Sequence, residues 1–264
     1  MELKQLTKKV CSISKEVGAF IQHESTKLNS GDIEIKSKNS LVTYVDKTAE
    51  KKLVNFLSAL IPEAGFIAEE GTSDKTGKVY NWVIDPLDGT TNFIHGIPTY
   101  CISIALLKNK ELISGVIYEP NQDEMFYAWK NGGAYLNGKS ISVSSTKKIS
   151  NALLATGFPY YDYKRLDGYM NILKWLMHNS RGVRRIGSAA IDLAYVACGR
   201  FDAFYEYSLN PWDVAAGAII VKEAGGSVKD FEGGENYMFG KEILASNLHV
   251  ESELLNRIKQ FFLS

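Results

Sequence analysis

The chain has 264 residues, of which 45% are hydrophobic and 23% charged, so it is long and apolar enough to bury a large core. Its 30 basic and 30 acidic residues cancel, and this balance gives no reason to expect nucleic acid as a partner. No apolar run is long enough for a membrane span, and the pattern of a signal peptide is missing, so we expect a cytoplasmic protein. Buried, reduced thiols are expected at Cys11, Cys101 and Cys198.

The first predicted elements are two helices. Apolar residues recur at helical spacing from about Leu3 to Leu28, which predicts an amphipathic helix. A polar loop that contains Lys36 follows this helix. Asp46 then opens a second helix, which has one apolar face and ends before Pro62.

Strands are predicted next. Residues 82–84 form a short apolar run suited to a buried strand, and Pro86 should end this strand because proline has no amide donor. From Tyr100 to Ile141 the sequence is rich in Val, Ile, Tyr and Gly and is interrupted by polar turn residues, which predicts antiparallel strands. The pair Asn137-Gly138 is typical of a hairpin turn.

After residue 150 strands and helices alternate. We therefore expect two halves, residues 1–150 and 151–264, that form one compact unit. The pattern alone predicts a mixed α/β protein with two sheets. Strands are expected at about residues 153–156 and 201–206, and helices at about residues 165–178, 189–198, 211–224 and 249–263.

A group of polar residues follows the strand at residues 82–84. Asp85 and Asp88 lie three residues apart across a bend and can converge on one hard cation, while the amides of Gly89 and Thr90 open a short helix able to hold an anion. Taken alone, Asp-Gly-Thr-Thr is also typical of a surface turn. The site is favoured because further acids flank apolar runs: Asp46, the pair Glu69-Glu70, and Asp213.

Several segments together match one known pattern: Asp46, Glu69-Glu70, residues 85–93, residues 187–190, Glu206, and Trp212-Asp213 followed by Gly225-Gly226. In this order and at this spacing they resemble the inositol monophosphatase family of magnesium-dependent, lithium-sensitive sugar phosphatases. The resemblance covers about residues 36–247, nearly the whole chain. It implies a layered αβαβα sandwich, the fold of inositol monophosphatase and fructose-1,6-bisphosphatase, with the site where the two halves face each other.

The resemblance implies two Mg²⁺ ions per site, with a third near Glu69 in relatives. Glu69, Asp85 and the main-chain carbonyl of Leu87 would hold the ion that binds the attacking water. Asp85, Asp88 and Asp213 would hold the ion that steadies the leaving oxygen. A set of oxygen ligands without histidine or cysteine suits magnesium.

The resemblance also assigns the catalytic groups. Thr90, hydrogen-bonded to Asp46, would position the water and help to deprotonate it, together with Glu69, which holds the ion that binds this water. The amides of Gly89 and Thr90 would bind the phosphate. The nucleophile is therefore expected to be water and not a side chain.

A substrate pocket follows from the same resemblance. Glu206 is expected to accept hydrogen bonds from sugar hydroxyls, although the sequence alone would favour an exposed acid at a strand end. Ser188 and Ala189, at the start of a helix, are expected to line the same pocket, together with Asp88 and Asp213.

Four residues near these motifs keep open interpretations. Arg184 and Arg185 are expected to be solvated charges or subunit contacts, although relatives often carry an arginine at Arg184 that buttresses the pocket. Glu70 is expected to support the neighbouring glutamate instead of binding metal. Lys36 is expected to lie on a flap.

The leading functional prediction is a phosphomonoesterase that hydrolyses inositol 1-phosphate and related small polyol phosphates. The alternative within the same class is a fructose-1,6-bisphosphatase or dual-specificity sugar phosphatase. The alternative from another class is a regulatory or binding module that keeps the fold without turnover. The expected assembly is a homodimer, and the expected partner is a small phosphate ester.

Overall fold

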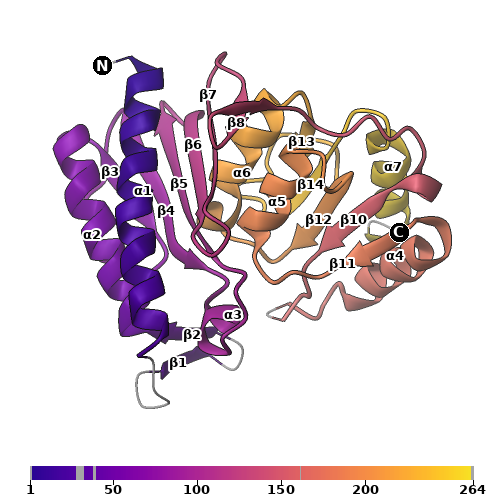
Figure 1. Ribbon diagram of the computed structural model, residues 1–264. Coiled ribbons are helices and arrows are strands. Elements are labelled where there is room, and N and C mark those ends of the chain that lie inside the picture. Colours follow the sequence, from indigo (N-terminus) through magenta and orange to yellow (C-terminus); the bar gives the residue numbers. More distant parts are fainter. Residues whose placement is uncertain (1, 28–32, 38–39, 161, 263–264) are drawn as a thin grey trace.

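Two β-sheets alternate with three pairs of helices in the structure, a computed structural model that describes residues 2–27, 33–37, 40–160 and 162–262 (Figure 1). One pair covers the outer face of the larger sheet, one lies between the sheets, and one covers the outer face of the smaller sheet. The expected αβαβα sandwich is therefore confirmed. In the same order, the pairs are α1 (Leu3–Ser25) with α2 (Tyr44–Leu60), α5 (Ala189–Ala197) with α6 (Pro211–Glu223), and α4 (Leu166–Asn179) with α7 (Glu251–Phe262).

The larger sheet has seven strands in sequence order, from β3 to β9. β3 and β4 are parallel, and all the other neighbours are antiparallel, as predicted for residues 100–141. The strands are β3 (Gly65–Ala68), β4 (Tyr80–Asp88), β5 (Cys101–Lys108), β6 (Glu111–Glu119), β7 (Glu124–Trp129), β8 (Ala134–Leu136) and β9 (Lys139–Ile141).

The smaller sheet has five strands in the order β11-β10-β12-β14-β13. β10 is parallel to β11 and β12, whereas β14 is antiparallel to both of its neighbours. The strands are β10 (Leu153–Thr156), β11 (Gly182–Arg184), β12 (Ala203–Tyr207), β13 (Ser227–Lys229) and β14 (Glu242–Ser246). A hairpin of β1 (Ile33–Ser37) and β2 (Ser40–Thr43), the short helix α3 (Thr90–Ile94) and a 3₁₀ turn at Ile149–Asn151 complete the elements.

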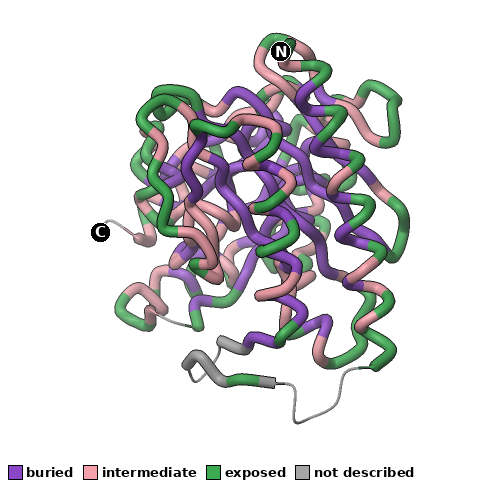
Figure 2. The backbone as a smooth tube through the Cα atoms, turned by 90° about the vertical axis from the view of Figure 1, so that its left-hand side faces the viewer, coloured by how far each residue is buried: buried purple, intermediate pink, exposed green. Residues whose placement is uncertain are grey.

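Burial explains why the two kinds of helix differ in sequence. α1 buries one face against the larger sheet and leaves the other face exposed (Figure 2). In α6 every residue from Val214 to Val221 is buried, because this helix lies between two sheets and has no solvent face. Gly115 on β6 permits this packing, since a Cβ there would lie 2.5 Å from Ile219 Cγ2 and 2.7 Å from the Ala216 carbonyl oxygen.

Two expected boundaries differ from the observed ones. Asp46 does not open the second helix, because α2 begins at Tyr44 and Thr43 is its N-cap. The first helix ends at Ser25, and the expected end at Leu28 lies outside the described residues. No helix within the described residues has the length and apolar composition needed to cross a membrane. The three cysteines are free thiols; Cys11 and Cys101 are buried as expected, whereas Cys198 is only partly buried.

Candidate active site

The site begins at the carboxyl end of β4. We expected Pro86 to end this strand, but β4 continues to Asp88 because the ladder absorbs one extra residue there. Asp85 pairs with Ser103 and Asp88 pairs with Cys101, so three steps on β4 match two steps on β5. In a regular strand, residues three apart point to opposite faces. This bulge therefore brings Asp85 and Asp88 to the same face of the sheet.

Gly89 makes the turn from β4 into α3. Its φ of 99° is left-handed, and a Cβ there would lie 3.0 Å from the Thr99 carbonyl oxygen, so a side chain is excluded for two reasons. The turn places Thr90 at the first position of α3. Thr90 Oγ1 lies 3.0 Å from Asp46 Oδ1 and 3.0 Å from the Leu87 carbonyl oxygen. Because a hydroxyl has one proton, Thr90 can donate to only one of these two acceptors at a time.

Asp46 is held by the start of α2. Its Oδ2 accepts hydrogen bonds from the Thr43 amide at 2.8 Å and the Thr43 hydroxyl at 2.6 Å, while Oδ1 faces Thr90. Burial raises the pKa of Asp46, although the hydroxyl and amide donors oppose this shift. The aspartate therefore links the second helix to the turn that follows β4.

Glu69 follows β3, the parallel neighbour of β4. Its amide donates to the Ile84 carbonyl oxygen at 3.2 Å, which places Glu69 beside the end of β4. Glu50, a fully buried residue of α2, accepts the amides of Glu70 and Thr72, each at 2.8 Å. Glu50 was not predicted as a site residue, because an acid within an amphipathic helix carries no signal of this role.

Each of the two helices of the middle layer has an acid of the site at its start. Asp88 Oδ2 accepts the Ser188 hydroxyl and the Ala190 amide, both at 2.7 Å, at the start of α5. Asp213 lies in the first turn of α6, where its Oδ2 accepts the Asn210 amide at 2.7 Å. Asp88 therefore joins the larger sheet to residues from the second half of the chain.

The acids of the site repel each other strongly. The pKa of Asp85 lies well above its usual range because the side chain is buried and because Glu69, Asp88 and Asp213 lie near it. Burial raises the pKa of Asp88 to about 6, against the stabilising donors of Ser188 and Ala190 and the charge of Arg185. The pKa of Asp213 is also raised well above its usual range, by burial and by Asp88.

The donor set fits a hard divalent cation. Asp85, Asp88 and Asp213 each accept donors from the protein on one carboxylate oxygen, and the other oxygen of each makes no hydrogen bond to the described residues. Within the described parts of the chain, no three or more His, Cys, Asp or Glu side chains are already arranged around one point as metal ligands. A divalent cation between these acids would relieve the repulsion that raises their pKa values.

A cavity of about 130 Å³ adjoins these acids. Every residue predicted for the substrate pocket lines this cavity. Asp46, Glu69, Asp85 and Thr90 do not line it. The lining residues are Asp88, Gly157, Arg185, Gly187, Ser188, Ala189, Asp192, Glu206, Leu209 and Asp213. Burial and the charge of Asp88 raise the pKa of Glu206 to about 8, and the charge of Arg185 opposes this shift.

The arginine at this cavity is Arg185 and not Arg184. The guanidinium of Arg185 stacks 5.5 Å from the ring centre of Phe158 and 5.4 Å from that of Tyr160. Arg184 is exposed and donates to the Val183 carbonyl oxygen at 3.1 Å. The side chain of Lys36 lies outside the described residues.

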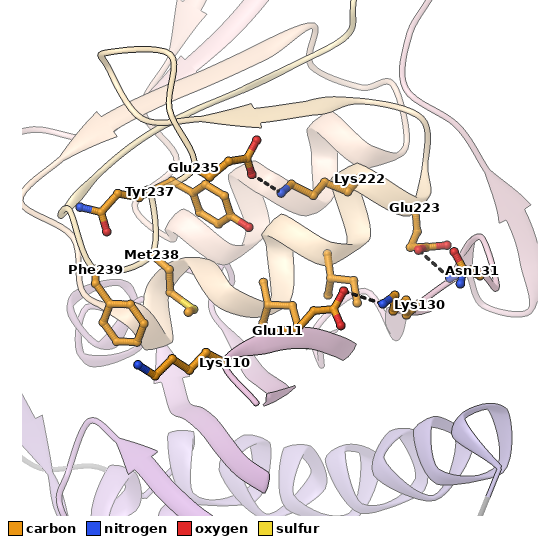
Figure 3. A pocket seen from close by; sticks show the side chains of 13 residues that line it. Lys110, Glu111, Lys130, Asn131, Lys222, Glu223, Glu235, Tyr237, Met238 and Phe239 are labelled. Atoms are coloured by element: carbon orange, nitrogen blue, oxygen red, sulfur yellow. Dashed lines mark hydrogen bonds and ion pairs between the residues drawn. The ribbon is translucent and has the colours of Figure 1, made fainter. Parts of the chain in front are cut away.

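A larger cavity, of about 480 Å³, lies at the other end of α6 from Asp213 (Figure 3). Four of its charged side chains form two ion pairs, Lys130 with Glu111 at 2.5 Å and Lys222 with Glu235 at 2.9 Å. No carboxylate of the β4 site lines this cavity. The smaller cavity is therefore the candidate active site, in spite of its size.

Known proteins resemble this chain over nearly its whole length. The profile of the inositol monophosphatase family matches residues 2–262. "Nus factor SuhB" from Pseudomonas aeruginosa is 41% identical over 251 residues, which cover 93% of each chain. "Inositol monophosphatase" from Dictyostelium discoideum is 39% identical and covers 96% of this chain and 94% of its own.

The fold of a solved structure agrees with these sequence matches. The extragenic suppressor protein suhB from Bartonella henselae superposes with a TM-score of 0.91 at 36% identity, over 97% of this chain and 99% of that one. The family match spans far more than half of the chain and includes the acids and the cavity described above. This chain is accordingly a member of the inositol monophosphatase family and a phosphoric monoester hydrolase.

Proposed function

We propose that the protein is a Mg²⁺-dependent phosphomonoesterase that hydrolyses inositol 1-phosphate and related small polyol phosphates with a metal-activated water. One observation carries this proposal. Besides burial, the charges of Asp88 and Asp213 raise the pKa of Asp85, and the charge of Asp88 raises the pKa of Asp213, beside a cavity that Asp88, Asp213 and Glu206 line. Two of the acids proposed to bind the cation and the acid proposed to bind hydroxyl groups thus line the same cavity.

The family resemblance supports the following assignment of metal ligands. Glu69, Asp85 and the Leu87 carbonyl oxygen would hold one Mg²⁺, and Asp85, Asp88 and Asp213 would hold the second. A third ion would lie near Glu69. When bound, the ions supply positive charge to the phosphate oxygens and the leaving oxygen and make a bound water more acidic.

Thr90 and Asp46 would position that water. A hydroxyl that donates its proton to Asp46 Oδ1 has its lone pairs free to accept a hydrogen bond from the water, which orients an oxygen lone pair toward phosphorus. The anionic form of Asp46 is required as the acceptor. The amides of Gly89 and Thr90 would bind the phosphate oxygens and hold the ester in line with the water.

The substrate hydroxyls would contact the cavity wall. Glu206 would accept their hydrogen bonds, and Ser188 and Ala189 would shape the pocket beside Asp88 and Asp213. Fructose 1,6-bisphosphate is the alternative substrate, because the same acids serve both reactions and only the shape of the cavity distinguishes them. A phosphate-release screen with Mg²⁺ against inositol 1-phosphate, fructose 1,6-bisphosphate and nucleotides tests the proposal, and it fails if inositol 1-phosphate is not hydrolysed.

A second role, as a regulatory or binding protein, is favoured by the name of the P. aeruginosa relative, Nus factor. The two roles are separable by replacing that relative's gene with this chain or with its Asp85→Asn variant. Rescue of the deletion phenotype by both proteins would support a binding role that needs no turnover. Rescue by the wild-type protein alone would assign the phenotype to catalysis.

We further propose that the chain is a cytoplasmic homodimer that lithium inhibits, with the two halves meeting near residue 150. Lithium would occupy the site of Asp85, Asp88 and Asp213 after the ester has broken and retain the phosphate. Inhibition would then increase with substrate concentration. Steady-state rates at several lithium and substrate concentrations test this, and purely competitive inhibition would contradict it.

A further inference from the structure

Asp192 lines the candidate substrate cavity and is not one of the proposed metal ligands or substrate contacts. It is the fourth residue of α5, one turn after the N-cap Ser188. Its side chain is 1% exposed and forms part of the cavity wall with Asp88 and Glu206. The other residues of α5 are apolar or small except for Tyr195, so Asp192 is the only charged residue of this helix.

Asp192 differs from Asp88 and Asp213 because it has no hydrogen-bond donor among the described residues. Its Oδ1 is fully buried and has no partner among the described residues, and no hydrogen bond to its other oxygen occurs there either. By contrast, Asp88 accepts two donors and Asp213 accepts one. A buried carboxylate without donors is costly, and such groups in folded proteins normally have a partner.

The helix dipole explains only part of why an acid occupies position 192. An acid in the first turn of a helix is stabilised by the helix dipole, and this alone could retain Asp192. The same stabilisation is obtained by an exposed acid, as Asp167 shows in the first turn of α4. The dipole therefore accounts for an acid at this position but not for its burial in the cavity.

The groups around Asp192 indicate what it would bind. Glu206 and Asp88 raise its pKa, together with burial, and Arg185 opposes them. Glu206 is fitted against Gly157, where a Cβ would lie 2.0 Å from the Glu206 carboxyl carbon. Two carboxyl groups thus share a cavity of about 130 Å³, a volume that admits part of a small ring, and each has oxygens that can accept a hydrogen bond. Neutral donors such as hydroxyls suit this pair better than anions, which both acids would repel.

We propose that Asp192 accepts a hydrogen bond from a substrate hydroxyl next to the hydroxyl bound by Glu206, so that the cavity selects phosphate esters with two adjacent hydroxyls. This inference rests on the proposed hydrolysis of polyol phosphates. It adds how many substrate hydroxyls the cavity recognises. Esters that present only one hydroxyl to the cavity would leave one of the two acids without a donor.

The first test compares kcat/KM for inositol 1-phosphate and for p-nitrophenyl phosphate, which has no hydroxyls. Asp192→Ala should lower the ratio of these two values on the order of 10- to 100-fold, the effect of one hydrogen bond to a charged group. Asp192→Asn keeps one acceptor oxygen and should lower the ratio less. Asp167→Asn is the matched control for the loss of an acid in a helix first turn, and it should leave the ratio unchanged.

The second test needs no stable variant of Asp192. With the wild-type protein, monodeoxy inositol phosphates should reveal two adjacent ring positions at which loss of the hydroxyl lowers kcat/KM. Glu206→Gln should remove most of the sensitivity at one position and leave the other. Sensitivity at a single position would overturn the proposal, as would equal losses on both esters in Asp192→Ala.

The two levels of the proposal fail in different ways. If the wild-type protein hydrolyses a different polyol phosphate from the screen, that ester replaces inositol 1-phosphate in the ratio, and the inference about Asp192 is tested without change. If the protein hydrolyses only esters without hydroxyls, both the polyol phosphatase and the role of Asp192 are overturned. A normal polyol phosphatase whose ratio does not respond to Asp192→Ala overturns the further inference alone.

Discussion

Thr90 Oγ1 and Asp46 Oδ1 lie 3.0 Å apart, and this contact joins residues 44 positions apart in the chain. The aspartate oxygen that faces Thr90 is distinct from the oxygen that accepts the two donors of Thr43. The start of α2 therefore fixes the carboxylate, and the carboxylate fixes the threonine hydroxyl. The proposed orientation of the attacking water depends on this relationship.

Substituting Thr90 with valine keeps its shape but removes the hydroxyl. We expect Thr90→Val to lower kcat about 100-fold or more, the usual contribution of a positioned proton acceptor, with little change in KM. Thr90→Ser is the matched control, since it keeps the hydroxyl and should retain most of the activity. Steady-state phosphate release decides between these outcomes, and equal activity of the valine and serine variants would remove Thr90 from the mechanism.

Asp85 is expected to contact both metal ions. Asp85→Asn keeps the size of the side chain but removes the charge, and it should lower turnover roughly a thousandfold. The variant should also need more Mg²⁺ for half-maximal activity. Near-normal turnover with unchanged Mg²⁺ dependence would exclude the bridging role.

Glu50 supports the site through the backbone. Glu50→Ala would leave the amides of Glu70 and Thr72 without their acceptor and should cost about 1–3 kcal/mol of stability. Turnover should also fall, because the neighbouring Glu69 would lose its fixed position. Thermal melting and kcat are the measurements, and Glu63→Ala, on an exposed residue just after α2, is the control. A melting temperature equal to that of the control would contradict this role.

The raised pKa values predict an unusual pH dependence of stability without metal. The pKa of Glu206 is raised to about 8, whereas an unfolded glutamate loses its proton near pH 4.3. Between these values the folded protein binds the extra proton, so its stability should fall as the pH rises toward 8. The pKa of Asp88, at about 6, contributes in the same direction over the lower part of this range.

Thermal melting in EDTA between pH 5.5 and 8.5 measures this effect. The melting temperature should fall with pH in the wild-type protein and fall less in Glu206→Gln, which has no carboxyl to titrate at that position. Added Mg²⁺ should oppose the fall, because it binds the deprotonated acids. An identical slope in both proteins would show that Glu206 does not hold a raised pKa.

Much of the fold was predictable because the long elements carry clear periodic patterns. The expected helix at residues 211–224 matches α6, Pro211–Glu223, and the expected strand at residues 153–156 matches β10. The strands β11 and β13 were missed because three residues are too few to show a period, and the five-residue strand β14 was missed as well. The bulge at Asp85 was missed because proline normally ends a ladder, and only the pairing with β5 reveals the extra residue.

The site was predictable only in part. The motif residues were identified by resemblance, and the structure places Asp88, Ser188, Ala189, Glu206 and Asp213 around one cavity, while their chemical roles stay predictions. Glu50 and Asp192 were not identified, and Arg185 was interpreted as a solvated charge or subunit contact, because the importance of these residues depends on what they face. For Asp192 a signal existed: it is the one charged residue in the apolar segment from Ala189 to Ala197.

The dependence of phosphate release on Mg²⁺ tests the central claim most directly. Wild-type protein stripped with EDTA is assayed with inositol 1-phosphate, first in excess chelator and then after Mg²⁺ is restored. Because every proposed ligand is a hard oxygen donor and the acids repel each other without a cation, activity should be lost in chelator and return with Mg²⁺. Full turnover in excess EDTA would contradict the proposed mechanism.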